Sequence, residues 1–390
     1  MDLNKDIKLS ELVRRPSKKK TRAPGITKPS AKNRKKHRKQ EIVGLKIGAS
    51  QIAASRVVNN GNAKLVQLAR VELDPGVVVA GEVRNVTALA EALDTFFTEN
   101  KLPRRGIRLG IGTNRIGVRT VDIEGIEDDR QVDNAVRFRA HDALSIPLDQ
   151  AVLDYHVVSE TVDESGAVSR RVLLAAAYQE PIDHYINACR AAKIELSGID
   201  VEAFALLRAV APQAAGSDGK ATVASVVVSI GHDRSTLAIS AGSICDFMRV
   251  LDWGGAKLES AIARDLGLTA DEATKLKLRL DLWSHASEGE DDPQVSGARE
   301  AVSRELQTLA REIIASLEFY QGEPGSLAIS EVLITGGTTR LPGLAEELER
   351  LTRVPVRVAD PLAAVQVSNG LAERDDLASL AVAIGLGVES

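Results

Sequence analysis

The chain has 390 residues, enough for two or more hydrophobic cores, because a single core stops growing at roughly 250–300 residues. Its composition, 44% hydrophobic and 27% charged, is that of an ordinary globular protein. No apolar run approaches the roughly 20 residues of a membrane-spanning helix.

Residues 1–40 hold 15 Lys or Arg against three acids, a net charge of +12, although the whole chain carries −4. We therefore expect a disordered basic tail. Its partner stays open between an anionic membrane, nucleic acid and no dedicated partner.

The two cysteines indicate the redox state of the compartment. Cys189 and Cys245 lie far apart and outside any CxxC spacing, so neither a disulfide nor a zinc site is predicted and a reducing cytoplasm is favoured. The charges at the N-terminus are not followed by an apolar stretch, so we expect no signal peptide.

Ordered structure is expected from residue 41. Strands are predicted at 42–47, 52–59 and 64–73, a helix capped by Thr87 at 87–100, and a further strand at 106–112. Residues 117–199 read strand, helix, strand, strand, helix, strand, which predicts a compact α+β subdomain. A helix at 201–210 and a Gly/Ala/Ser-rich linker at 212–221 follow.

The second half repeats the opening pattern. Strands are predicted at 222–230, 235–240 and 243–250. Helices are expected at 255–265, 269–283 and 297–320, with a solvated acidic loop at 288–292. A strand at 331–335, a helix at 341–351, a strand at 354–358 and a closing helix at 377–386 complete the chain.

Three glycine turns are candidates for ligand binding. The first contains Gly48, Ala49 and Ser50, the second Gly231 and His232, and the third Gly336, Gly337, Thr338 and Arg340. Glycine lets backbone N–H groups approach phosphate oxygens closely, so two hairpin tips and one strand-to-helix turn could hold a nucleotide between them. Each turn alone is a weak signal. The three together, in this order, are far more specific.

This order resembles the phosphate-1, phosphate-2 and adenosine motifs of the superfamily that contains actin, sugar kinases and DnaK-type chaperones. Segments 143–155 (with Ile146-Pro147 and Leu153-Asp154-Tyr155), 172–176, 200–205, 253–255, 272–275 and 381–386 further resemble the PilM family. The resemblance covers about 41–390.

The resemblance implies an α/β, actin-like (ribonuclease H-like) two-lobed fold with an inserted α+β subdomain. Subdomain 1A would be 41–116, with 200–221 and 370–390 returning to it. The inserted subdomain 1C would be 117–199. The second lobe would be 222–369, with subdomain 2A and a subdomain 2B at about 256–325. Gly255, Glu272 and Lys275 would join the nucleotide site.

Two positions depart from the superfamily pattern, which places an acid two residues before the glycine of each phosphate hairpin. Those positions hold Lys46 and Ser229. A lysine repels Mg²⁺, and losing both acids argues against phosphoryl transfer. We therefore expect no catalytic residues, no metal site and weak or absent hydrolysis. Two interpretations of ATP stay open. In the first, Lys46 replaces magnesium against the phosphates. In the second, the cleft is degenerate and empty, or Lys46 pairs with an internal carboxylate.

The resemblance implies a cytoplasmic scaffold of type IV pilus assembly, peripheral to the inner membrane. It would bind the N-terminal tail of a PilN-like membrane protein, near 137–154, and would link it indirectly to the assembly motor ATPase. Self-association into a ring is also implied. An FtsA-like division protein is the first alternative, although we expect such a chain to end in an amphipathic helix. An ATP-dependent phosphotransferase is the second.

Overall fold

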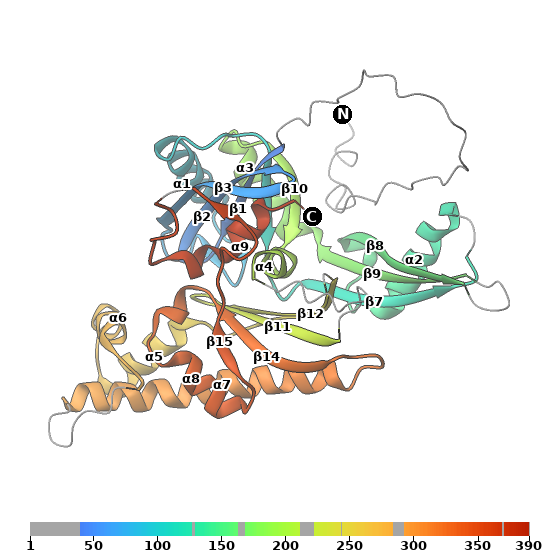
Figure 1. Cartoon of the computed structure of the whole chain (residues 1–390). Coiled ribbons are helices and arrows are strands. Elements are labelled where there is room, and N and C mark those ends of the chain that lie inside the picture. The colour runs from blue at the N-terminus through green and yellow to red at the C-terminus, as the bar shows by residue number, and fades with distance from the viewer. Residues whose placement is uncertain are drawn as a thin grey trace, which may run out of the picture.

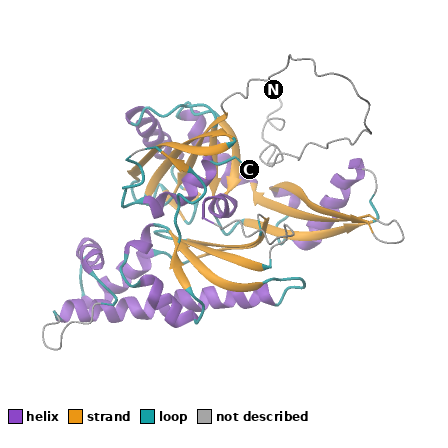
Figure 2. Cartoon of the chain, in the orientation of Figure 1, coloured by secondary structure: helices purple, strands orange, loops and turns teal. Residues whose placement is uncertain are grey.

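The computed structural model describes residues 40–126, 129–162, 168–210, 222–242, 244–283, 292–368 and 370–389. Residues 1–39 of the basic tail, the linker predicted at 212–221 and most of the acidic loop lie outside these ranges. Within them, no helix is long and apolar enough to cross a membrane. Two lobes face each other, and a smaller α+β unit projects from one side (Figures 1 and 2).

The first lobe is built on a six-stranded sheet in the order β10-β6-β1-β2-β3-β16. Its strands are β1 (Gln40–Ile47), β2 (Gln51–Asn60), β3 (Asn62–Glu72), β6 (Ile107–Ile111), β10 (Leu196–Val201) and β16 (Gln366–Val367). Its helices are α1 (Val86–Glu99), α3 (Gln179–Ala191), α4 (Glu202–Val210) and α9 (Leu377–Gly387). A short hairpin, β4 (Val78–Val79) with β5 (Glu82–Val83), lies between β3 and α1 and was not expected.

The second lobe contains a five-stranded sheet in the order β13-β12-β11-β14-β15. The strands are β11 (Val223–Ile230), β12 (Ser235–Ala241), β13 (Ile244–Leu251), β14 (Ala328–Thr335) and β15 (Val356–Val358). The helical elements are α5 (Gly255–Leu266), α6 (Ala270–Arg279), α7 (Pro293–Gln321), η3 (Gly337–Arg340) and α8 (Leu344–Thr352).

The two sheets share one connectivity. In each, the first three strands pair antiparallel in sequence, and the fourth and fifth add in parallel on the far side of the first. The repeat expected from the sequence is therefore a repeat of the fold. Because the first strand is central in each sheet, most of its side chains are apolar and buried: Ile42, Val43, Leu45 and Ile47 in β1, and Ala224, Val226, Val227, Val228 and Ile230 in β11.

The inserted unit is a three-stranded antiparallel sheet in the order β7-β9-β8. It comprises β7 (Ile116–Glu124), α2 (Asp129–Ala143), η2 (Leu148–Gln150), β8 (Ala151–Val162) and β9 (Val168–Tyr178). Its core has Val172, Leu174 and Ala176 of β9 packed against Val132 and Val136 of α2.

The closing helix α9 lies against the first sheet, where glycines allow close approach. A Cβ atom on Gly44 or Gly385 would overlap backbone atoms of Ala383 or Ala205. The buried Arg108 donates from Nη1 to the carbonyl oxygens of Leu386 and Val388, at 3.2 and 2.8 Å. These contacts fix the C-terminal half of α9 against the first sheet and α4.

Some expected boundaries were wrong. The N-cap of α1 is Asn85, whose side chain accepts from Ala88 N–H at 3.0 Å, so Thr87 lies inside the helix. The helix expected at 269–283 ends at Arg279. The helix expected at 297–320 begins at Pro293, because Asp292 caps it and proline suits the first helical turn.

Candidate functional site

The three glycine turns meet at one cavity of about 330 Å³ between the lobes. Eleven of the thirteen predicted site residues line it: Lys46, Gly48, Ala49, Ser50, Gly231, His232, Gly255, Gly336, Gly337, Thr338 and Arg340. The volume lies at the lower end of the range of small-molecule pockets in proteins. Turns almost 290 residues apart in sequence thus form a single candidate binding site.

The two hairpin tips are closed in the same way. Gly48 N–H donates to the carbonyl oxygen of Gln51 at 2.8 Å, and Gly231 N–H donates to that of Arg234 at 2.9 Å. A Cβ atom on Gly231 would lie 2.6 Å from that same oxygen, so this turn has no room for a side chain. The structural repeat therefore presents two equivalent tips to the cavity.

The third turn is fixed to the second. Gly336 has φ 97°, which favours glycine, and a Cβ there would overlap the backbone of Ile230. Thr338 Oγ1 donates to the carbonyl oxygen of Gly231 at 3.0 Å, and Gly255 N–H donates to the same oxygen at 2.9 Å. The second-lobe wall of the cavity is therefore pre-formed.

Lys46 forms an ion pair with Glu202. Its ammonium nitrogen lies 2.5 Å from Glu202 Oε2, and the two side chains are 20% and 8% exposed. Glu202 opens α4 immediately after β10, and glycine at 112 leaves room for its carboxylate, since a Cβ there would lie 2.8 Å from Oε2. Of the two interpretations of Lys46, the geometry shows the internal carboxylate partner.

A second carboxylate of the cavity joins the lobes. Asp233, on the second hairpin tip, accepts from Ala80 N–H at 3.0 Å. Ala80 and Gly81 form the tip of the unexpected β4–β5 hairpin, and Tyr185 Oη donates to the carbonyl oxygen of Gly81 at 3.1 Å. Burial raises the pKa of Tyr185 well above its usual value, so it remains a donor.

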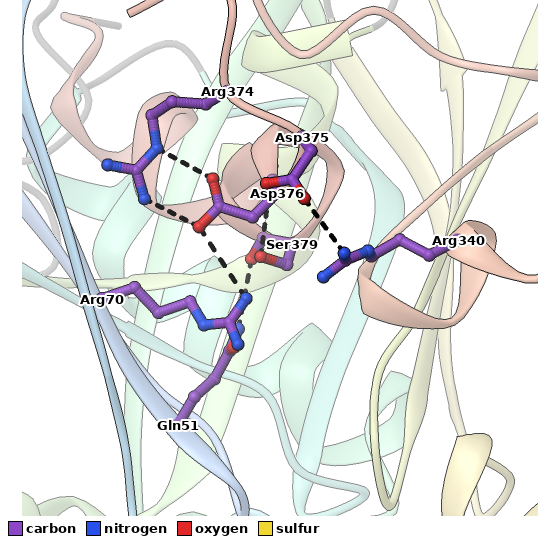
Figure 3. Close-up of polar contacts among 7 residues, drawn as sticks. All are labelled: Gln51, Arg70, Arg340, Arg374, Asp375, Asp376 and Ser379. Carbon is purple, nitrogen blue, oxygen red and sulfur yellow. Dashed lines mark hydrogen bonds and ion pairs between the residues drawn. The ribbon is translucent and has the colours of Figure 1, made fainter. Parts of the chain in front are cut away.

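Charged side chains near the start of α9 form a network (Figure 3). Arg374 binds Asp376 with two hydrogen bonds, which lower the pKa of the Asp376 carboxyl. Arg70 of the first lobe lies 3.8 Å from the same carboxylate, and Arg340 of the second lobe lies 3.1 Å from Asp375. Arg70 and Arg340 both line the cavity, so the segment before α9 holds a cation from each lobe.

Two predicted site residues lie elsewhere. Neither Glu272 nor Lys275 lines the cavity. Glu272 instead forms a capping box with Thr269 at the start of α6, accepting from its backbone N–H at 2.9 Å. From the same helix, Lys277 and Leu278 line the cavity.

The lining residues that the sequence did not indicate include charged and polar groups from both lobes: Gln51, Arg70, Glu202, Asp233, Arg234, Lys277 and Ser379. Asp233 and Arg234 directly follow the predicted turn at Gly231 and His232, so their position in the sequence was enough to predict them as lining residues. Glu202 lay in a segment that carried the family resemblance, but no local pattern assigned it to the cavity.

The chemistry of the cavity fits a nucleoside polyphosphate better than a metal ion. Glycine backbone and several Lys and Arg side chains surround it, as phosphate groups require. Magnesium prefers free carboxylates, whereas the first hairpin supplies Lys46 and the second Ser229. Throughout the described ranges, no cluster of three His, Cys, Asp or Glu could hold a metal ion.

Solved structures show the same fold. A PilM–PilN type IV pilus biogenesis complex is 25% identical, with a TM-score of 0.72, covering 89% of this chain and 97% of that one. The ADP-bound MreB5 of Spiroplasma citri is 12% identical, with a TM-score of 0.52, covering 89% and 94%. These neighbours confirm the predicted actin-like fold.

Sequence comparison gives the family. Two relatives are cell division proteins FtsA. That of Neisseria meningitidis serogroup B is 23% identical over 335 residues (79% of this chain, 80% of the relative). That of Pseudomonas aeruginosa is 24% identical over 348 residues (82% and 83%). The profile described as type IV pilus assembly protein PilM matches residues 44–390. The chain therefore belongs to the PilM family of type IV pilus assembly proteins.

Proposed function

We propose that this protein is a scaffold of pilus assembly that captures an extended peptide, the N-terminal tail of a PilN-like membrane protein. The observation that carries the proposal is the open edge of the inserted sheet. In the order β7-β9-β8, the strand β8 pairs with β9 alone among the described strands. An unpaired edge offers backbone N–H and C=O groups to an added strand.

The start of β8 adjoins a recess that could give sequence specificity. Val152 pairs with Ala177 of β9, next to Tyr178. Ala177 and Tyr178 line a small recess of about 10 Å³ where the inserted unit meets the first lobe. Arg115 forms its charged rim, with its guanidinium carbon 4.3 Å from the centroid of the Tyr178 ring. A peptide added to β8 could place one small side chain there.

The test is binding of a synthetic peptide with the N-terminal sequence of the PilN-like protein, followed by fluorescence anisotropy. Strand addition predicts that N-methylation of alternate peptide amides abolishes binding in one register and leaves it unchanged in the other. On the protein, Ile116→Lys in the recess should abolish binding, whereas Val162→Lys at the exposed far end of β8 should not. Equal affinity for both methylated peptides would overturn strand addition.

We further propose that the cleft binds a nucleotide as a structural ligand and that the protein is not an efficient ATPase. The support is the pairing of Lys46 with Glu202, which leaves neither group free to position a metal ion or an attacking water. Phosphate release from ATP should stay at the level of the buffer in a malachite green assay. A turnover that a Glu202→Gln substitution removes would refute this.

Attachment to the membrane would then be indirect. The PilN-like partner supplies the membrane anchor, and residues 1–40, with a net charge of +12, add attraction to anionic lipid. A ring of copies and a link to the assembly motor would follow from that platform. Co-sedimentation with anionic vesicles, with and without residues 1–40, measures the contribution of the tail.

A further inference from the structure

The charges of the cleft favour an anion that carries its full charge. Five cationic side chains line the cavity: Lys46, Arg70, Arg234, Lys277 and Arg340. Among the residues that the structure describes, two carboxylates line it, Glu202 and Asp233. Each of the five also pairs with a carboxylate, and the partners of Arg70, Arg234, Lys277 and Arg340 lie outside the lining. The cavity therefore presents mainly the cationic side of these ion pairs, which a polyanion can share, because screening by water is weaker in a partly closed site.

Neither carboxylate of the cavity is free to hold a divalent cation. Glu202 accepts from Lys46 Nζ at 2.5 Å. Asp233 accepts from the backbone N–H of Ala80 at 3.0 Å, so a metal ion bound there would have to break the contact between the lobes. Besides Asp233, the oxygen-bearing side chains that the second hairpin places at the cavity are the hydroxyls of Ser229 and Thr236. Hydrated magnesium therefore finds no ligand set.

A lining residue of the cavity, Arg234, has a buried nitrogen without an acceptor in the described part of the chain. Arg234 follows the second glycine turn, and its side chain is 12% exposed. One terminal nitrogen, Nη2, lies 2.9 Å from Asp252 Oδ1. The other, Nη1, is buried and has no hydrogen-bond partner among the residues that the structure describes. Buried guanidinium nitrogens are normally satisfied, and a phosphate oxygen is a preferred acceptor for them.

We infer that the cleft takes a metal-free nucleoside polyphosphate, whose phosphate oxygens share Lys46 with Glu202 and Arg234 with Asp252 in place of binding magnesium. The inference rests on the proposed nucleotide function and deepens it by naming the charge state of the ligand. Magnesium in solution then competes with the protein for the ligand. It binds the same phosphate oxygens and lowers the net negative charge of the nucleotide by two.

The first experiment is titration calorimetry of ATP into the full-length protein, in excess EDTA and then in excess MgCl₂. Removing two charges at contact distance weakens binding by about tenfold or more, given ~1 kcal/mol per charge pair even in water. Tighter binding in EDTA supports the inference. Binding that requires magnesium, or no binding in EDTA at millimolar ATP, overturns it.

Substitutions of single lysines test whether ATP binds inside the cavity in EDTA. Lys46→Gln should weaken binding in EDTA about tenfold, whereas the control Lys275→Gln, an exposed cation outside the cavity, should leave it unchanged. Because Lys46→Gln leaves Glu202 without its partner, the double variant with Glu202→Gln provides a neutral pair, and thermal unfolding checks its fold. Equal weakening by Lys46→Gln and Lys275→Gln would assign binding to surface charge and overturn the inference.

A third experiment tests whether the site recognises the nucleoside as well as the phosphates. Inorganic tripolyphosphate in EDTA should bind at least about tenfold more weakly than ATP, because it lacks the nucleoside that Leu278 and the glycine-lined wall of the cavity would contact. Equal affinity would show a plain anion site and overturn the nucleoside part. None of these results depends on the PilN-like peptide, so failure here is distinct from failure of the scaffold proposal.

Discussion

The ion pair between Lys46 and Glu202 gives the sharpest stability prediction. Removing one partner of a buried pair costs about 3–5 kcal/mol, since the remaining charge is left unsolvated. Lys46 keeps 20% of its side-chain surface in water and Glu202 8%, so water can partly solvate the remaining charge. We therefore expect Lys46→Met to lower the free energy of unfolding by about 2–3 kcal/mol.

The assay is urea unfolding of a double-mutant cycle with Lys46→Met, Glu202→Gln and the double variant, followed by near- and far-ultraviolet circular dichroism. The two probes should give coincident transitions, as free energies require. The double variant should lose less unfolding free energy than the two single variants together, by about 1–2 kcal/mol. The matched control is Arg56→Met in the more exposed pair of Arg56 with Glu41 on the same sheet, 2.6 Å apart with side chains 37% and 35% exposed, which should cost under ~1 kcal/mol. A Lys46→Met variant within ~0.5 kcal/mol of wild type would refute the reasoning.

Three further predictions concern packing, pH and the thiols. Gly385→Ala should destabilise by about 3 kcal/mol because its methyl group overlaps the Ala205 backbone, whereas Gly322→Ala, with its nearest contact at 3.5 Å, should be near neutral in thermal unfolding. Burial raises the pKa of Asp154 from 3.8 to about 6, so the folded state binds more protons and stability falls as pH rises through this range. The loss, discounted for partial exposure, is about 1–2 kcal/mol. Asp154→Asn should flatten that slope in urea titrations, and an unchanged slope contradicts the assignment. Burial raises the pKa of Cys189 to about 12 and also raises that of Cys245, so Ellman's reagent at pH 8 should label neither thiol until urea is added. A fast thiol in the native protein would show that one is exposed.

Sequence reasoning predicted the glycine turns well, because their geometry is local. A glycine between two β-branched strands at Gly48 and at Gly231 indicates a hairpin tip wherever the strands pack. The repeated strand order then places both tips at the same end of equivalent sheets. For this reason eleven predicted residues meet in one cavity.

Other features could not be read from sequence because they depend on tertiary contact. The partner of Lys46 is 156 positions away, and nothing near Glu202 indicates that β10 lies in the same sheet as β1, with only β6 between them. For Glu272 the prediction of a nucleotide-site role was wrong although the sequence contained the local signal for its actual role. The Thr269–Glu272 spacing is a capping-box signature that was available from the sequence, and that local role accounts for the residue.

The hairpin β4–β5 links the cleft to the recess beside β8. Ala80 at its tip donates to Asp233 in the cleft, and Glu82, two residues on, lies 3.6 Å from Arg115 at the recess. A nucleotide that moves Asp233 should therefore change peptide affinity, and reciprocity requires the same fold-change in nucleotide affinity when the peptide is bound. Asp233→Asn and Glu82→Gln should each reduce that fold-change, whereas Glu180→Gln, an exposed partner of Arg115 at 3.4 Å, should not. Peptide affinities that are identical with and without saturating nucleotide would show that the two sites act independently.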